Sequence, residues 1–266
     1  MSETTLSQAE VEAFHRDGYV VPAFRFDDDK LTGLQRLAGE LLTANAEFGD
    51  TPMVCPHVPG GGVQGLRGDQ AWMRYSDDPG VLDMMEQLLG PNLILWGTNL
   101  FHKPAGIGRR IPFHRDGRYW PIEPLRTITA WVAIEDSTRD NGCLEIIPGS
   151  HLGKQVGAHF SSEDPADAIP ETLAPAEFDE SEAVPVEMEA GQIVLFDVFT
   201  IHGSRANSGN RRRIGYAMRY MPAGSWFNHD GAERAETSGN AHNTRPLFLL
   251  RGVDECGRND FDRGHP

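Results

Sequence analysis

The pentapeptide Phe-His-Arg-Asp-Gly occurs twice in this chain, at residues 14–18 and again at residues 113–117. A His and an Asp two positions apart point to the same face of a β-strand, but to nearly opposite faces of a helix. Only a copy outside a helix can therefore bring both side chains to one metal ion. The sequence around each copy decides which pair is a candidate site.

The first copy ends the amphipathic segment Ser7–Arg16, which is predicted to be a helix. Its first residue is a suitable N-cap, Glu10 three positions later completes a capping box, and Gly18 ends the helix. On such a helix the side chains of His15 and Asp17 diverge. We therefore predict that the first copy binds no metal.

The second copy follows the strand-like run Leu93–Phe101 and a loop rich in glycine and proline. A strand setting would place His114 and Asp116 on one face. We predict that these two residues bind one metal ion together.

Composition limits the class of protein. A chain of 266 residues can form one large domain with a sizeable core. The formal charge of −15 argues against nucleic acid or an anionic membrane as a partner. With no transmembrane run, no signal peptide and only three scattered cysteines, the cytoplasm is the expected location.

Hydrophobic patterning predicts helices early and strands later. Helices are expected at 7–16, 28–48 and 78–89, and strands at 93–103, 127–135, 143–147, 184–188, 193–201 and 213–221. We expect a single domain, 1–266: a helical N-terminal layer (about 7–90), an antiparallel barrel or sandwich (about 93–221) and an irregular C-terminal segment (222–266) that could fold over the barrel mouth. The acidic stretch 159–181 is predicted to be a surface insertion.

Two of these strands have one apolar face and one small or polar face. The polar faces hold Thr127, Thr129, Trp131 and Ala133 on one strand, and Arg213, Gly215, Ala217 and Arg219 on the other. The metal pair needs a cavity, so we predict that these faces line its interior.

His202 follows another apolar strand, which leads into a turn at Asn207–Asn210. If Ser208 and Gly209 are the two central turn residues of a hairpin, Ser204 opposes Arg213. Opposed residues share a sheet face, and His202 shares it by alternation. We therefore expect these three side chains to enter one cavity.

Two His and one carboxylate form the facial triad that holds non-haem Fe(II) and leaves positions open for a 2-oxo acid and O2. His114, Asp116 and His202 fit that pattern. A 2-oxo dicarboxylic acid also needs a fixed cation for its far carboxylate. Arg213 supplies a two-donor fork that stays charged when buried, and Ser204 can add a hydroxyl donor.

The chain resembles the phytanoyl-CoA dioxygenase family of Fe(II)/2-oxoglutarate oxygenases, from residue 14 to about residue 221. The matching blocks are Phe14–Val21, His114–Pro121, Trp131, Asn141–His151, His202, Ser204 and Arg213. The resemblance implies a mainly β fold, a double-stranded β-helix (a jelly-roll, cupin-like barrel) with flanking N-terminal helices. It also implies that His114, Asp116 and His202 bind iron.

By the same resemblance, Ser204, Arg213, Trp131 and Asn99 contact 2-oxoglutarate. The family has a further lysine contact in the segment that aligns with Gly60–Gln64, where this chain has no basic residue. Gln64 or Asn99 is the expected substitute. The cosubstrate site therefore departs from the family pattern at this point.

Five other arginines flank the predicted mouth and suit either an anionic substrate or ion pairs at the surface: Arg109, Arg110, Arg118, Arg126 and Arg219. The sequence as a whole predicts an Fe(II)- and 2-oxoglutarate-dependent dioxygenase that hydroxylates a small molecule with O2. One alternative is a cupin-like hydrolase or isomerase with zinc in the triad. The other is a barrel that binds a ligand without catalysis.

Overall fold

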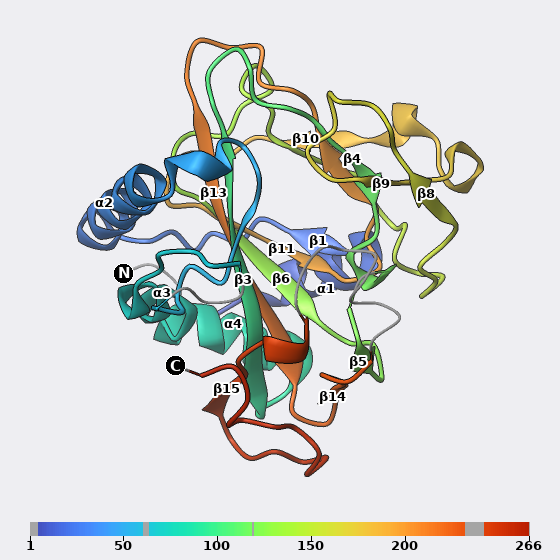
Figure 1. The fold of residues 1–266 in the computed structure, drawn as a ribbon. Coiled ribbons are helices and arrows are strands. Elements are labelled where there is room, and N and C mark those ends of the chain that lie inside the picture. The colour runs from blue at the N-terminus through green and yellow to red at the C-terminus, as the bar shows by residue number, and fades with distance from the viewer. Residues whose placement is uncertain (1–4, 61–63, 119, 232–241, 266) are drawn as a thin grey trace.

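The computed structural model describes residues 5–60, 64–118, 120–231 and 242–265, and two antiparallel sheets dominate it (Figure 1). The larger sheet has the order β1-β11-β6-β13-β3-β15, with β2 also paired to β3. Its strands are β1 (Tyr19–Val20), β2 (Met53–Val54), β3 (Leu93–Lys103), β6 (Ile128–Ala133), β11 (Ile193–Asp197), β13 (Arg213–Pro222) and β15 (Phe248–Arg251).

The smaller sheet has the order β10-β7-β12-β4. Its strands are β4 (Ile111–His114), β7 (Leu144–Ile146), β10 (Val184–Val186) and β12 (His202–Ser204). Two short pairs stand apart, β5 (Ile122–Glu123) with β14 (Trp226–Phe227) and β8 (His159–Ser161) with β9 (Glu171–Leu173).

The chain repeatedly crosses between the two main sheets. From β3 in the larger sheet it passes to β4, back to β6, across to β7 and β10, and then through β11 and β12 to β13. Eight strands wound in this way form a jelly roll, the double-stranded β-helix. The expected fold class is confirmed.

The helices also follow the sequence closely. They are α1 (Gln8–Asp17), α2 (Asp28–Ala44), α3 (Met73–Ser76) and α4 (Pro79–Leu89), with 3-10 turns η1 (Ala46–Phe48), η2 (Gln70–Trp72), η3 (Asp116–Arg118), η4 (Pro175–Glu177), η5 (Glu180–Glu182) and η6 (His242–Thr244). Ser7 and Glu10 form the expected capping box of α1, and Gly18 ends it at a φ of 81°. The first pentapeptide copy is therefore helical.

The helices α2, α3 and α4 lie together beside the long strands of the larger sheet (Figure 1). Leu34 of α2 and Met84 of α4 are fully buried and share one hydrophobic cluster with Val132 of β6 and with Tyr216 and Met218 of β13. Burying that apolar face stabilises the fold. The opposite face of both strands consequently turns toward the barrel interior, as the alternation predicted.

Three expectations need correction. The C-terminal segment is not wholly irregular, because β15 pairs with β3 at the edge of the larger sheet. The predicted hairpin is wrong: β12 lies between β7 and β4, whereas β13 lies between β3 and β6. The stretch 159–181 is not only a surface insertion, because Glu171 and Leu173 are buried.

Among the described residues, no helix has the length and apolar character needed to cross a membrane.

Candidate metal centre and cavity

The space between the two sheets is a cavity of about 380 Å³. Seven of the residues predicted to form the site line it: Asn99, His114, Asp116, Trp131, His202, Ser204 and Arg213. The interior faces of both sheets contribute, as expected from the strand patterns. The structure thus brings the predicted metal ligands and the predicted cosubstrate contacts into one cavity.

The three predicted ligands are buried and close together. The Nε2 atom of His114 lies 3.5 Å from Oδ1 of Asp116, and Nε2 of His202 lies 4.0 Å from Oδ2 of the same carboxylate. One ligand atom from each residue falls within 4.8 Å of the others. This spacing suits three ligands that surround one ion.

Asp116 reaches the site by a route that the sequence argument did not foresee. The strand β4 ends at His114, and Asp116 begins the 3-10 turn η3, so strand alternation does not apply to it. A Cβ atom at Gly117 would lie 2.8 Å from a side-chain carbon of Leu125 and 3.1 Å from one of Val156. The glycine of the pentapeptide therefore lets this turn pack tightly beneath the site.

Backbone carbonyl groups orient both imidazoles. Nδ1 of His114 lies 2.9 Å from the carbonyl oxygen of Pro112, and Nδ1 of His202 lies 3.0 Å from that of Thr200. An Nδ1–H that donates to a carbonyl leaves Nε2 with the free lone pair that a metal needs. Both Nε2 atoms face Asp116, so the residues present fit a divalent ion such as Fe(II).

The protonation states agree with metal binding. Burial lowers the pKa of His202 to about 4, so its imidazole is neutral at neutral pH. Burial alone would raise the pKa of Asp116, but its close contacts with the two imidazoles and the nearby positive charge of Arg219 bring it to about 2. The site therefore offers a neutral imidazole and a carboxylate anion.

The first pentapeptide copy has a structural role instead. His15 is exposed on α1, and Asp17 pairs with Arg16 of the same helix. The carbonyl oxygen of His15 lies 3.1 Å from Nε2 of His151, which is thus hydrogen-bonded to the end of α1. Neither residue of this copy reaches the cavity.

Arg213, Ser204 and Trp131 come together at one wall of the cavity. The Arg213 side chain is 1% exposed, and its Nη2 donates to the carbonyl oxygen of Gly142 at 2.8 Å and to Oγ of Ser204 at 3.4 Å. Its guanidinium carbon lies 5.3 Å from the centre of the Trp131 ring. Burial lowers the pKa of Arg213 to about 10, so it remains charged at neutral pH.

This arrangement arises from a contact between the sheets rather than from the predicted hairpin. Arg213 pairs with Lys103 of β3, and Ser204 pairs with Leu144 of β7 and Ile111 of β4. The prediction that the two side chains share a cavity is therefore confirmed, although the register from which it was derived is wrong.

Lys103 is a buried residue beside this group that the sequence analysis did not single out. Its Nζ atom donates to the carbonyl oxygens of Ser204 and Arg205, which ties β3 to the end of β12. Burial, and then the nearby charge of Arg213, lower its pKa to about 6. No local pattern in the sequence pointed to it, because its burial depends on contacts with residues about a hundred positions away.

The two expected substitutes for the family lysine have other partners. Residues 61–63 of the aligned segment lie outside the described residues. Oε1 of Gln64 accepts a hydrogen bond from the backbone of Val54 at 2.8 Å, and Oδ1 of Asn99 accepts one from Arg219. Both side chains line the cavity.

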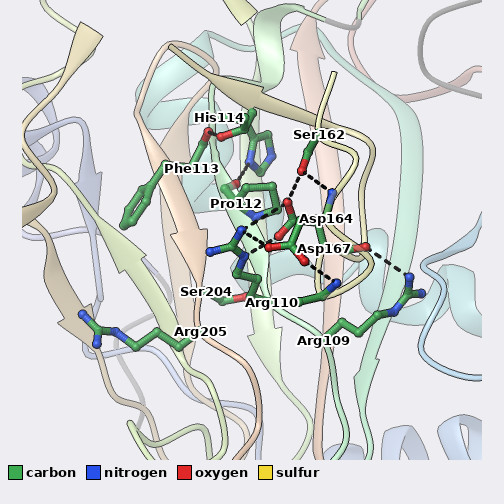
Figure 2. A network of polar contacts seen from close by, with 12 residues as sticks. Arg109, Arg110, Pro112, Phe113, His114, Ser162, Asp164, Asp167, Ser204 and Arg205 are labelled. Atoms are coloured by element: carbon green, nitrogen blue, oxygen red, sulfur yellow. Dashed lines mark hydrogen bonds and ion pairs between the residues drawn. The ribbon is translucent and has the colours of Figure 1, made fainter. Parts of the chain in front are cut away.

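Most of the arginines near the mouth form ion pairs. Arg109 pairs with Asp50. Arg110 pairs with Asp164 and Asp167, and Arg109 also donates to the carbonyl oxygen of Asp167 (Figure 2). These contacts hold the stretch 159–181 against β4, so that Ala168, Ile169 and Pro170 line the cavity. Arg118 lies 3.8 Å from Glu171, and Arg126 donates to the carbonyl oxygen of Leu88. Arg219 differs from these four arginines, because its side chain is buried inside the barrel and lines the cavity.

The C-terminal segment, which was predicted to fold over the barrel mouth, contributes two residues to the cavity wall. His242 of η6 and the adjoining Arg245 are 1% and 2% exposed, and both line the cavity. The carbonyl oxygen of Arg245 lies 2.8 Å from Nε2 of His229, which fixes the backbone there. No pattern in the sequence pointed to these two residues.

The fold and the site together define a jelly-roll barrel with a two-His, one-carboxylate centre inside. The chain belongs to the phytanoyl-CoA dioxygenase (PhyH) family, whose model matches residues 14–215. This confirms the family resemblance inferred from the sequence.

Individual relatives agree with that assignment. A probable phytanoyl-CoA dioxygenase of Caenorhabditis elegans is 35% identical over 163 residues, which cover 57% of this chain and 52% of that protein. The chain thus spans about half the length of the relatives that it matches at this level. An ectoine dioxygenase of Sphingopyxis alaskensis is 26% identical over 94% of this chain and 84% of its own length.

Solved structures support the fold. The apo form of ThoJ, described as a non-heme monooxygenase, superposes with a TM-score of 0.72 at 24% identity, covering 94% of this chain and 86% of its own.

Proposed function

We propose that this protein is an Fe(II)- and 2-oxoglutarate-dependent dioxygenase that hydroxylates a C–H bond of a small-molecule metabolite. The observation that carries the proposal is one cavity holding both a buried His–Asp–His triad and a buried arginine with no carboxylate partner in the described part of the chain. Family membership and relatives named as dioxygenases support it.

The triad would hold the ferrous ion through Nε2 of His114, Nε2 of His202 and the carboxylate of Asp116. Bound there, Fe(II) supplies the redox chemistry that couples O2 to the oxidation of 2-oxoglutarate and substrate. Thr200 and Pro112 keep the imidazoles in the orientation that binding needs, because their carbonyl oxygens accept from Nδ1.

Arg213 and Ser204 would bind the far carboxylate of 2-oxoglutarate. A guanidinium offers that carboxylate two parallel donors, and the Ser204 hydroxyl adds a third. Trp131 packs against the guanidinium and limits the directions in which it can point. These residues would orient the cosubstrate so that its 2-oxo acid end reaches the triad.

The reaction balances as substrate C–H, O2 and 2-oxoglutarate going to the alcohol, succinate and CO2. A cavity of about 380 Å³ suits a small molecule, and the charge of −15 supports neither nucleic acid nor an anionic membrane as a partner. The cytoplasmic location stays a prediction.

The test is reconstitution with Fe(II) under anaerobic conditions, followed by oxygen and 2-oxoglutarate. We expect oxygen uptake and succinate formation in equal amounts, both lost when His202→Ala removes a ligand. A zinc-loaded protein that turns over a substrate without oxygen uptake would instead support the hydrolase or isomerase. Absence of any 2-oxoglutarate binding would refute the proposal.

A further inference from the structure

Two buried guanidinium groups lie in the cavity apart from Arg213. Arg219 comes from β13 and is 8% exposed, and Arg245 comes from the C-terminal segment and is 2% exposed. Both line the cavity. The proposed reaction assigns no task to either residue.

The hydrogen-bond and ring contacts of these two arginines are with neutral groups, and the one carboxylate whose charge acts on Arg219 is that of Asp116, a proposed metal ligand. Arg219 donates to Asn99, and its guanidinium carbon lies 5.0 Å from the centre of the Trp120 ring and 5.8 Å from that of Trp96. Nη1 of Arg245 lies 3.1 Å from Sγ of Cys55. Within the described part of the chain, neither arginine has a carboxylate within ion-pair distance, and the buried Nε atom of each has no hydrogen-bond partner.

The two positive charges also lie near each other. Arg219 pairs across the sheet with Gly97, and a Cβ atom at Gly97 would lie 3.4 Å from Nη1 of Arg245. Two buried like charges with neutral partners are unfavourable. An anion bound between them would relieve both the repulsion and the unsatisfied donors.

In the proposed reaction both carboxylates of the cosubstrate have other partners. Arg213 and Arg219 are six residues apart on one face of β13, so their Cα atoms are separated by roughly 20 Å at the usual rise of a strand. A five-carbon dicarboxylate that spans from Arg213 to the triad has its far carboxylate on Arg213 and its other end at the ferrous ion. Its two negative charges, with that of Asp116, balance the ferrous ion and Arg213, which leaves Arg219 and Arg245 without counter-charge.

We propose that Arg219 and Arg245 bind an anionic group of the substrate, a carboxylate or a phosphate, so that the substrate class is a small anionic metabolite. The inference rests on the proposed dioxygenase reaction for its cosubstrate, but not for the anion site itself. Held at this end of the cavity, the substrate would present its C–H bond toward the triad.

The test is equilibrium dialysis of radiolabelled benzoate, phenyl phosphate and benzamide, under anaerobic conditions with saturating Fe(II) and 2-oxoglutarate. Benzamide has nearly the shape of benzoate without its charge. We expect at least one of the two anions to bind at least tenfold more tightly than benzamide. The tighter of the two anions identifies the group as carboxylate or phosphate.

Variants then test whether the preference for anionic probes over benzamide depends on residues of the cavity. Arg219→Met and Arg245→Met should each remove most of it, whereas the lysine variants should retain part. Arg258→Met is the matched control, because Arg258 stacks on Trp226, 3.5 Å from the ring centre, in the same segment but exposed and away from the cavity. Arg245 lies outside the two sheets. The Arg245→Met variant therefore remains informative if Arg219→Met fails to fold.

Equal binding of all three probes, no binding of either anion, or a preference that survives in both methionine variants would overturn the inference. Failure of the proposed function would look different. In that case 2-oxoglutarate would not bind, while the anion preference would still depend on Arg219 and Arg245. Loss of the preference in Arg213→Met alone would refute the inference and leave the dioxygenase proposal standing.

Discussion

His114 and His202 are directly opposed residues on the neighbouring antiparallel strands β4 and β12, and their ring centres lie 4.4 Å apart. Opposed side chains leave a sheet on the same face. The two imidazoles are therefore positioned by the pairing of the smaller sheet itself, and only Asp116 depends on a turn. A metal site built on paired strands is held rigidly, as precise ligand geometry requires.

The duplicated pentapeptide gives the first prediction. Ala at His114 or at Asp116 should abolish ferrous binding and succinate formation, because each removes one of three ligands. Ala at His15 or at Asp17 should leave both unchanged, because those residues lie on α1 outside the cavity. Calorimetric titration with Fe(II) measures the ferrous binding, a succinate assay measures the turnover, and circular dichroism checks the folding of each variant. Loss of iron binding in the folded His15→Ala protein would show that the wrong copy has been assigned.

The length of the acidic side chain is the subject of the second prediction. Asp116→Glu keeps the charge but adds a methylene group in a turn that is already tightly packed at Gly117. Because metal binding depends on ligand distances, we expect a large loss of ferrous affinity. Titration of the variant beside the wild type tests this. Wild-type affinity and activity would mean that Asp116 does not ligate the ion.

Arg213 and its neighbour Arg212 provide the third prediction. Arg213→Ala should raise the 2-oxoglutarate concentration needed for half-maximal turnover at least tenfold, since a contact of this type contributes roughly 2–5 kcal/mol. Ferrous affinity should hardly change. Arg213→Lys should recover part of the loss, because an ammonium group lacks the two-point fork.

Arg212→Ala is the matched control for that experiment. Arg212 is exposed and pairs with Glu135 at 2.8 Å, so its loss should have little effect on the 2-oxoglutarate requirement. Steady-state kinetics at varied 2-oxoglutarate separates the two variants. Equal effects at both positions, or a larger one at Arg212, would contradict the assigned carboxylate contact.

Stability at low pH gives the fourth prediction. Burial, and then the charges of Arg245 and His265, lower the pKa of His57 from 6.5 to about 3. Between these two values the unfolded chain binds a proton that the folded protein does not. The free energy of unfolding should therefore fall as the pH falls, by up to about 1.4 kcal/mol per pH unit for this residue.

Denaturant unfolding of the metal-free protein at about pH 7 and about pH 5 measures that dependence. His57→Gln should make it flatter, whatever it does to the absolute stability. His15→Gln, at an exposed position on α1, serves as the control and should keep the wild-type slope. An unchanged slope in His57→Gln would show that the buried imidazole does not resist protonation.

Local patterns in the sequence were sufficient for the helices, the long strands and the inward faces. Ser7 with Glu10, and Asp78 with Pro79, mark helix starts by contacts within a few residues. The alternation in β13 likewise shows which side is apolar. The proposed metal ligands could be identified because a short motif carries two of them and the end of an apolar strand carries the third.

Features that depend on contacts between residues far apart in the sequence could not be predicted from local patterns. The exit of the chain from β12 into a different sheet leaves no local trace, so a hairpin was the natural but wrong prediction for Ser204 and Arg213. Lys103 is buried through contacts with residues about a hundred positions away. Arg245 lies in a polar segment and enters the cavity only through tertiary packing.

Arg245 lies outside the eight barrel strands. The residues proposed to bind the substrate and those proposed to bind iron and 2-oxoglutarate therefore belong in part to different segments of the chain. The strands hold every residue assigned to iron and 2-oxoglutarate except Asp116, which lies in the turn after β4, while one of the two arginines assigned to the substrate arrives from the segment after β13. Under the proposed function, replacement of that segment would change which substrate binds while leaving the residues assigned to iron and 2-oxoglutarate in place. Substrate selectivity can thus change, in evolution or by engineering, while the residues assigned to iron and 2-oxoglutarate stay the same.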